Sequence, residues 1–274
     1  MKRVVTMQDL SCMGKCSLTV ALPVLSAMGI ECAVLPTAVL STHTAFPKPA
    51  VLELGSHAED IMDHWASLEP DFDGIGIGYL ASPGQCLQAE TLIRRFGGKD
   101  CFVCVDPAMA DHGKLYAGLS REHPAAMRRL CALADLILPN LTEGALLTGM
   151  EYRPEPDPGY YREMVEALLA LGCGGVMLTG FAPRNGQIGV LGKMRDGDFF
   201  SCQRSRIHRH CHGTGDLFAA VVLGGILRGL PPERAGDIAC GMVYAAIENT
   251  PGDSRYGVAF EGCIAGLLER LQKH

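Results

Sequence analysis

The chain has 274 residues, of which 48% are hydrophobic and 20% are charged, and its formal net charge is −6 at pH 7. This composition is that of a globular protein and excludes the disordered class. A negative net charge argues against a nucleic-acid surface, and no run of about twenty apolar residues is present that would span a membrane. We therefore expect neither a nucleic-acid partner nor a membrane.

The N-terminus and the cysteines favour a cytoplasmic protein. Met1-Lys2-Arg3 leads into an apolar stretch that meets Gln8-Asp9 too early for a secretory signal. The 12 cysteines then act as reduced thiols, because disulfides are rare in the cytoplasm. Cys101 and Cys104 form a C-x-x-C pair inside an apolar stretch, but a zinc site would need a second such pair.

Predicted strands alternate with predicted helices along the whole chain. The hydrophobic patterns predict strands over residues 2–7, 31–37, 74–80, 101–105, 135–138 and 174–179, and a hairpin made of 187–192 and 199–204. They predict helices over 17–28, 58–67, 84–96, 121–134, 160–171, 217–227, 233–248 and 260–272, and one more that ends at Gly149. Because no linker or repeat interrupts this alternation, we expect residues 1–274 to form a single domain. Its fold class is α/β, with a mostly parallel central sheet and helices on both faces.

Polar clusters follow several of the predicted strands. They occupy residues 8–11, 41–44, 106, 140–143 and 179. In a parallel sheet, ligands bind in the crevice outside the carboxyl ends of the strands. The pattern therefore predicts one crevice that collects these side chains.

The stretch Gly213-Thr214-Gly215-Asp216 precedes the predicted helix over 217–227. The first turn of a helix has unpaired N–H groups and the positive end of the helix dipole, which together bind anions. Asp216 would repel a static anion, so its position suggests a general base that takes a proton from an attacking hydroxyl. The structural alternative is that Asp216 only caps the helix.

Three other clusters have a structural and a functional interpretation. Asn140 and Glu143 either cap the helix that ends at Gly149 or belong to a ligand site. Residues 41–44 either form a turn held by their own side chains or bind a polar ring. The alternating His208, His210 and His212 could share one side of a strand and bind a metal. Separately, residues 111–119 form a predicted loop rich in glycine and charge, which is a candidate flap.

The glycines of Gly74-Ile-Gly-Ile-Gly78 do not match a dinucleotide-binding turn, because they lie inside the apolar run and lack the full spacing. Glycines inside a strand more often mark the close approach of another backbone or a ligand. We therefore expect a close contact at this strand.

Taken together, these motifs resemble the ribokinase-like superfamily, and within it the pyridoxal and pyridoxamine kinase family. The resemblance covers the length of the chain. It rests on the following segments: Gly213–Asp216, Thr37–Thr44, Gly78-Tyr79-Leu80, Asp106-Pro107, Pro139–Glu143 and Val176–Gly180.

The resemblance implies an ATP-dependent kinase that phosphorylates the 5′-hydroxymethyl group of a B6 vitamer. Asp216 would be the base, and Gly213, Thr214 and Gly215 would form the anion hole. Asp106 and Glu143 would organise Mg²⁺, and Asn140 and Thr179 would approach the nucleotide. The substrate residues implied are Asp9, Ser11, His43, Thr44 and Tyr79. The family also suggests a monovalent cation and a homodimer.

One departure keeps a second substrate open. Gln8-Asp9 followed by Ser11 is similar to the hydroxymethylpyrimidine kinases of thiamin synthesis, whereas an aspartate at position 216 is typical of the pyridoxal kinases. The alternatives are therefore a hydroxymethylpyrimidine kinase and a non-catalytic B6- or nucleotide-binding protein on the same fold. Cys211, beside the anion hole, is either a packed thiol or a group that captures an aldehyde substrate.

Overall fold

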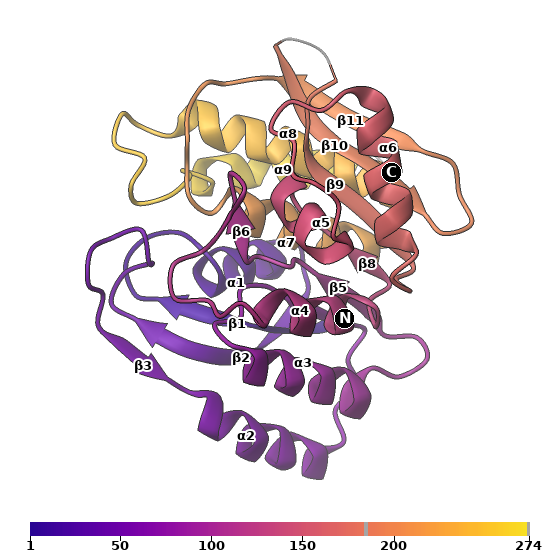
Figure 1. The fold of residues 1–274 in the computed structure, drawn as a ribbon. Helices are drawn as coiled ribbons and strands as arrows, with labels where there is room; N and C mark the ends of the chain where they lie inside the picture. Colours follow the sequence, from indigo (N-terminus) through magenta and orange to yellow (C-terminus); the bar gives the residue numbers. More distant parts are fainter. Residues whose placement is uncertain (184–185, 273–274) are drawn as a thin grey trace.

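A computed structural model describes residues 1–183 and 186–272. Its central feature is a nine-stranded sheet in the order β11-β10-β9-β8-β5-β4-β1-β2-β3 (Figure 1). The strands are β1 (Arg3–Ser11), β2 (Glu31–Leu40), β3 (Val51–Glu53), β4 (Gly74–Ile77), β5 (Phe102–Val105), β8 (Leu136–Ile137), β9 (Gly175–Phe181), β10 (Gln187–Met194) and β11 (Phe200–Ser205). Neighbouring strands from β2 to β9 run parallel, whereas β3, β10 and β11 pair antiparallel at the two edges. The predicted mostly parallel α/β sheet is confirmed.

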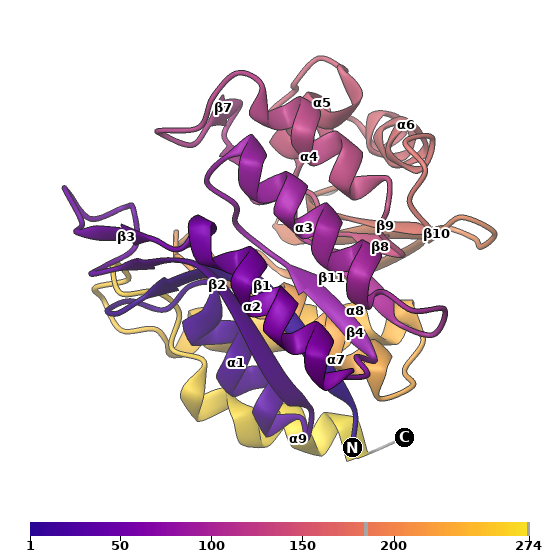
Figure 2. The same ribbon diagram turned by 90° about the horizontal axis from the view of Figure 1, so that it is seen from below.

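Helices cover both faces of this sheet, as Figures 1 and 2 show from two directions. One face carries α1 (Leu18–Ala27), α7 (Thr214–Leu227), α8 (Pro232–Asn249) and α9 (Ile264–Gln272). The other carries α2 (Gly55–Leu68), α3 (Pro83–Phe96), α4 (His123–Cys131), α5 (Leu141–Thr148) and α6 (Pro158–Leu169). Within the described parts of the chain, no helix combines the length and the apolar character needed to cross a membrane.

The alternation of side chains along each strand produces a separate hydrophobic core on each face. Val4 of β1 packs in the core beneath α1 and α7, whereas its neighbour Val5 packs in the core beneath α2 and α3. Successive residues of a strand point to opposite faces, so a strand buried on both sides is apolar throughout.

Helix α7 lies close to the sheet at the glycines of β4. A Cβ atom on Gly76 would lie 2.8 Å from the Leu223 side chain, and one on Gly74 would lie 3.0 Å from Leu227. The predicted close contact at this strand is therefore confirmed, and the neighbour is helix α7. This contact fixes the height of α7 over the middle of the sheet.

Several boundaries differ from the sequence prediction. Strand β1 continues through Ser11, so Asp9 lies within the strand and not in a loop. Strand β3 was not predicted, because its three residues are all exposed and have no apolar pattern. The predicted flap contains a small hairpin of β6 (Ala110–Asp111) and β7 (Lys114–Leu115). Its two turn residues, His112 and Gly113, both have positive φ, as tight hairpin turns require.

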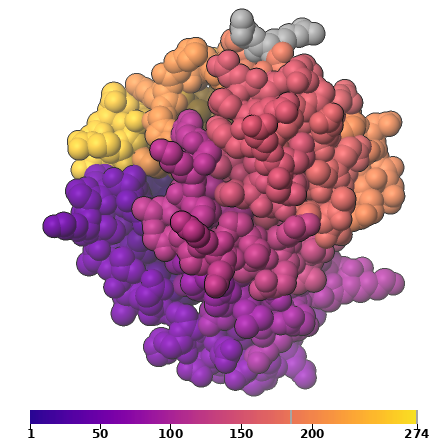
Figure 3. Space-filling model, viewed as in Figure 1, coloured from indigo at the N-terminus to yellow at the C-terminus, as the bar shows by residue number. Residues whose placement is uncertain are grey.

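The first and last quarters of the chain lie side by side (Figure 3). The backbone amide of Lys15 donates to the carbonyl of Tyr256 at 2.9 Å. Nε2 of His43 lies 2.7 Å from the carbonyl oxygen of Arg255. These contacts bring a loop before α1, a loop after β2 and a loop before α9 to the same edge of the sheet.

Candidate active site

Helix α7 begins at Thr214, three residues before the predicted start at Leu217, and its N-cap is Gly213. Gly213 has φ of 79°, and a Cβ atom there would collide with the carbonyl oxygen of Lys15. Glycine is therefore required for both the backbone conformation and the close approach of the loop before α1. Asp216 lies inside the first turn and is not the cap, so the capping alternative for Asp216 is wrong.

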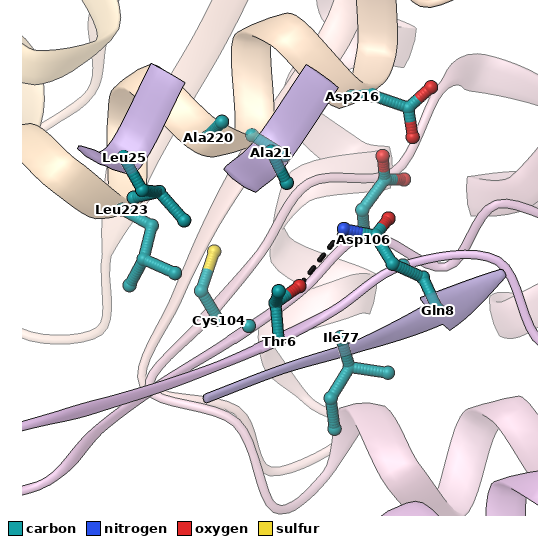
Figure 4. A pocket seen from close by; sticks show the side chains of 13 residues that line it. Thr6, Gln8, Ala21, Leu25, Ile77, Cys104, Asp106, Asp216, Ala220 and Leu223 are labelled. Atoms are coloured by element: carbon teal, nitrogen blue, oxygen red, sulfur yellow. Dashed lines mark hydrogen bonds between the residues drawn. The ribbon is translucent and has the colours of Figure 1, made fainter. Parts of the chain in front are cut away.

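The carboxylate of Asp216 faces that of Asp106 across a small cavity of about 30 Å³ (Figure 4). Asp106 follows β5 directly, and its backbone amide donates to the carbonyl of Ile77 at 2.8 Å. The cavity has the two acids at one end and Leu25, Leu223 and Cys104 at the other. A volume of this size has room for about one or two water molecules.

Burial changes the protonation of both acids. It raises the pKa of Asp216 to about 6, although a hydrogen bond from the backbone amide of Ser17 partly opposes this rise. Burial also raises the pKa of Asp106, and the nearby negative charge of Asp216 raises it further. The ionised pair is therefore unfavourable by itself and favours a bound cation between or beside the two carboxylates.

Asp9 and Ser11 lie at the carboxyl end of β1, where Ser17 joins them. The Ser17 hydroxyl donates to Oδ1 of Asp9 at 2.6 Å, and the Ser11 hydroxyl lies 3.4 Å from Oδ2 of the same carboxylate. Burial raises the pKa of Asp9, and these hydroxyl bonds act against that rise. Asp9 also interacts electrostatically with Asp216, which places this polar group beside the acid pair.

Asn140 and Glu143 form a capping box at the start of α5. The Asn140 side chain accepts from the backbone amides of Thr142 and Glu143 and donates to the carbonyl of Ala110 at 2.7 Å. The Glu143 carboxylate accepts from the backbone amides of Asn140, Met109 and Ala110 at 2.8, 3.1 and 3.5 Å. The capping interpretation is confirmed, and both side chains also hold the segment between β5 and the hairpin.

Glu143 nevertheless belongs to the same electrostatic cluster as the acid pair. Burial raises its pKa, and the charge of Asp106 raises it further. Thr179, on the neighbouring strand β9, points its hydroxyl to the carbonyl of Pro139 at 3.3 Å. The residues predicted to serve the metal and the nucleotide therefore lie on or just after three adjacent strands: Asp106 follows β5, Asn140 and Glu143 follow β8, and Thr179 lies in β9.

The residues predicted to bind the substrate differ in their exposure and in whether their side chains already have partners. His43 is buried, and both ring nitrogens have partners: the amide of Ala45 donates to Nδ1, which leaves the proton on Nε2 for the carbonyl of Arg255. Thr44 is exposed. Tyr79 lies with its ring 6.5 Å from that of Tyr116, which follows the hairpin.

The three histidines before α7 do not lie on a strand, because residues 206–211 have no regular structure, and that prediction is wrong. Within residues 1–183 and 186–272, no group of three or more His, Cys, Asp or Glu side chains is arranged to hold a metal ion. His212 packs between the rings of His43 and His210 at 4.6 and 5.1 Å. Cys211 is buried.

Two residues of the site, Thr6 and Ser17, were not predicted from the sequence, whereas Gln8 belongs to the predicted polar cluster 8–11. Thr6 and Gln8 line the cavity, with the Gln8 amide donating to the Thr6 hydroxyl at 2.9 Å. Gln8 lies against Gly78, where a Cβ atom would collide with its side chain. Ser17 could have been found only from its backbone conformation, which the sequence does not show.

A family model and a curated relative assign the chain to related families of kinases. The model of the phosphomethylpyrimidine kinase family matches residues 49–258. A pyridoxine/pyridoxal/pyridoxamine kinase of Bordetella avium is 30% identical over 264 residues, which cover 90% of this chain and 85% of that protein.

Solved structures agree with this assignment. The pyridoxal kinase of Lactobacillus plantarum is 35% identical, with a TM-score of 0.91 over 100% of this chain and 99% of that one. A Bacteroides thetaiotaomicron protein, assigned as a phosphomethylpyrimidine kinase and solved with pyridoxal, is 33% identical, with a TM-score of 0.93 over 97% and 95%. The chain therefore belongs to the phosphomethylpyrimidine kinase family and is related to the pyridoxal kinases of the ribokinase-like superfamily.

Proposed function

We propose that this protein transfers the γ-phosphoryl group of ATP to the 5′-hydroxymethyl group of a B6 vitamer, and so acts in vitamin B6 salvage. The observation that carries this proposal is the Asp216 carboxylate in the first turn of α7, facing Asp106 across the cavity. The relatives named pyridoxal kinase, and the related structure solved with pyridoxal, support a B6 vitamer as the acceptor.

In this mechanism Asp216 accepts the proton of the attacking hydroxyl. With a pKa raised to about 6, the carboxylate is ionised at neutral pH and is a better proton acceptor than an ordinary aspartate. The backbone amides of Gly213, Thr214 and Gly215, at the positive end of α7, would stabilise the charge of the migrating group. ATP supplies that group, and catalysis of this kind depends mainly on positioning and electrostatics.

The chemistry of the acidic cluster fits Mg²⁺. Hard divalent cations bind carboxylate oxygens, and Mg²⁺ keeps several of its waters. Asp106 would hold the ion, and Glu143 would act through water, because its oxygens already accept three backbone N–H groups. Asn140 and Thr179 would lie beside the nucleotide. A monovalent cation is a further expectation from the family.

The substrate ring would lie between β1 and Tyr79. Asp9 and Ser11 would hydrogen-bond its polar groups, and Tyr79 would pack on the ring. His43 would shape this side of the site through the loops that it joins, and the exposed Thr44 would lie at its outer end. We further propose that residues 1–274 form one kinase domain, that the protein is cytoplasmic, and that it assembles as a homodimer.

A second acceptor, hydroxymethylpyrimidine, is favoured by one feature of this chain. Asp9 and Ser11 stand together at the carboxyl end of β1, an arrangement that resembles the hydroxymethylpyrimidine kinases, and the matching family model describes phosphomethylpyrimidine kinases. The two acceptors are both heteroaromatic rings with a hydroxymethyl group, so the same base would serve either.

The test is ATP turnover with Mg²⁺ against pyridoxal, pyridoxamine, pyridoxine and hydroxymethylpyrimidine. We expect phosphorylation of a B6 vitamer, and a loss of at least about a hundredfold in kcat for Asp216→Ala, as for removal of a general base. Asp63→Ala is the matched control, because Asp63 is an exposed acid of α2 paired with Arg95. Turnover of hydroxymethylpyrimidine alone would correct the substrate, and binding without any turnover would support a non-catalytic protein.

A further inference from the structure

Ser17, the residue before α1, has a backbone conformation that residues with a side chain rarely adopt. Its φ is 49° and its ψ is −127°. Only glycine enters this region without strain, so another residue persists there only when its surroundings enforce the conformation. Such residues concentrate at functional sites.

The two polar groups of Ser17 bind two different acids of the site. Its backbone amide faces the carboxylate of Asp216, on α7, and lowers the pKa of that carboxylate. Its hydroxyl donates to Oδ1 of Asp9, on β1, at 2.6 Å. Ser17 is 4% exposed and Asp9 is 5% exposed, so the bond between them lies away from bulk water, where hydrogen bonds to a carboxylate are strong.

The conformation also serves the first turn of α1. The Ser17 carbonyl accepts from the amides of Val20 and Ala21 at 3.0 and 2.9 Å. Ser17 must therefore point its carbonyl into α1 and its amide at Asp216 at the same time. The positive φ satisfies both requirements, and the bond to Asp9 ties this peptide to β1.

Contacts to Thr19, Gly213 and Gly257 hold the remaining residues of the loop before α1. The Thr19 hydroxyl lies 2.8 Å from the carbonyl of Cys16 and 3.2 Å from that of Gly14. Gly213 and Gly257 both pack against the carbonyl of Lys15. A Cβ atom on either glycine would collide with that carbonyl oxygen. A loop held at so many points gives the Ser17 amide one direction.

We propose that Ser17 is a positioning residue for the phosphoryl transfer: its amide orients the Asp216 carboxylate, and its hydroxyl, anchored on Asp9, maintains the strained conformation that aims the amide. This proposal rests on the kinase function proposed above. Ser17 acts through Asp216 and does not itself touch the reacting atoms.

The first experiment compares kcat and the KM for ATP of the Ser17 variants with those of the wild type. The assay contains ATP, Mg²⁺ and the B6 vitamer that the wild type phosphorylates. Ser17→Gly tolerates the positive φ but removes the anchor, so the variant should fold and lose kcat by at least about tenfold, as small displacements of reacting groups do. The KM for ATP should stay within about twofold, since Ser17 does not bind the nucleotide. Ser17→Ala should behave in the same way, and thermal unfolding checks that each variant is folded.

Ser82→Gly is the matched control. Ser82 is the residue before α3, and its hydroxyl accepts from the amide of Gln85 at 3.2 Å, so it also lies at a helix N-terminus. Its removal should weaken α3 but leave kcat unchanged.

The second experiment repeats Ser17→Gly in the Asp216→Ala background. If Ser17 acts through Asp216, the residual rate should change by less than about twofold, because the group that it orients is gone. An equal loss in both backgrounds, or a wild-type kcat for both Ser17 variants, would overturn the proposal while leaving the kinase function intact. A wild type without turnover of any acceptor would overturn both proposals.

Discussion

Asp216 is a residue whose function works against the stability of the fold. Burial raises its pKa from 3.8 to about 6, so the ionised form needed by a base is unfavourable in the folded chain. Below pH 3.8 the group is protonated in both the folded and the unfolded states. As the pH rises from 3.8 toward 6, the unfolded state loses its proton first, and the folded state becomes less stable relative to it.

This conflict predicts that Asp216→Asn stabilises the protein. The amide stays neutral, so the free energy of unfolding should rise by on the order of 1–2 kcal/mol at pH 8 and by less at pH 5, where Asp216 is mostly protonated. Thermal unfolding at both pH values measures the difference. The exposed Asp63→Asn should show no such gain, and an unchanged Tm of Asp216→Asn at pH 8 would contradict the electrostatic argument.

Single residues were predictable where the chemistry is local to a strand end or a helix start. Asp106 was identified because an acid follows a buried strand, and Asn140 and Glu143 because they match a capping pattern. Ser17 was missed because its role depends on a positive φ, and a serine in the sequence gives no indication of that backbone conformation. Gln8 was predicted only as a member of the polar cluster 8–11, because its close packing depends on Gly78, which follows β4.

Helix α7 connects the fold to the site through the glycines at its two ends. Gly213 at the start and Gly229 just after the end both have positive φ, of 79° and 89°. They differ in their surroundings: a Cβ atom on Gly213 would collide with the Lys15 carbonyl, whereas nothing lies within 4 Å of one on Gly229. The pair therefore separates the effect of backbone strain from the effect of close packing.

We expect Gly213→Ala to be much more harmful than Gly229→Ala. Gly229→Ala should lower the free energy of unfolding by about 1 kcal/mol through strain alone and leave kcat unchanged. Gly213→Ala should also displace the loop before α1. It should therefore lower the free energy of unfolding by about 1–3 kcal/mol more than Gly229→Ala does, and reduce kcat by at least about tenfold. Chemical unfolding and steady-state kinetics test both variants, and equal effects of the two would show that the Lys15 contact does not matter.

Whole elements were predictable when their hydrophobic pattern was strong. The long helices and the buried parallel strands were found within a few residues of their ends. Strand β3 and the β6–β7 hairpin were not, because short exposed strands form through backbone pairing and turn geometry and need no apolar pattern. Helix α7 starts at Thr214, three residues earlier than predicted, and its N-cap Gly213 lies against the Lys15 carbonyl, about two hundred residues away in sequence.

At the scale of the whole molecule, the site joins parts of the chain that are far apart in sequence. Asp9 belongs to β1, Asp106 follows β5, Glu143 belongs to α5 and Asp216 to α7. These four acids interact electrostatically, and burial raises the pKa of each one. A cation bound beside the Asp106 and Asp216 carboxylates would therefore relieve repulsion between the end of β5 and the start of α7 and stabilise the folded chain.

This arrangement predicts that ATP stabilises the protein strongly only together with Mg²⁺. At a ligand concentration of a hundred times Kd, binding adds about 2.7 kcal/mol to the free energy of unfolding, which corresponds to a Tm increase of about 5 °C for a chain of this size. ATP with EDTA should give a much smaller shift, since the triphosphate then adds negative charge next to the acids. Asp106→Asn should reduce the part of the shift that depends on Mg²⁺, because it removes a carboxylate ligand while keeping the shape of the side chain. Equal Tm shifts with Mg²⁺ and with EDTA would show that Asp106 and Asp216 do not serve a divalent cation.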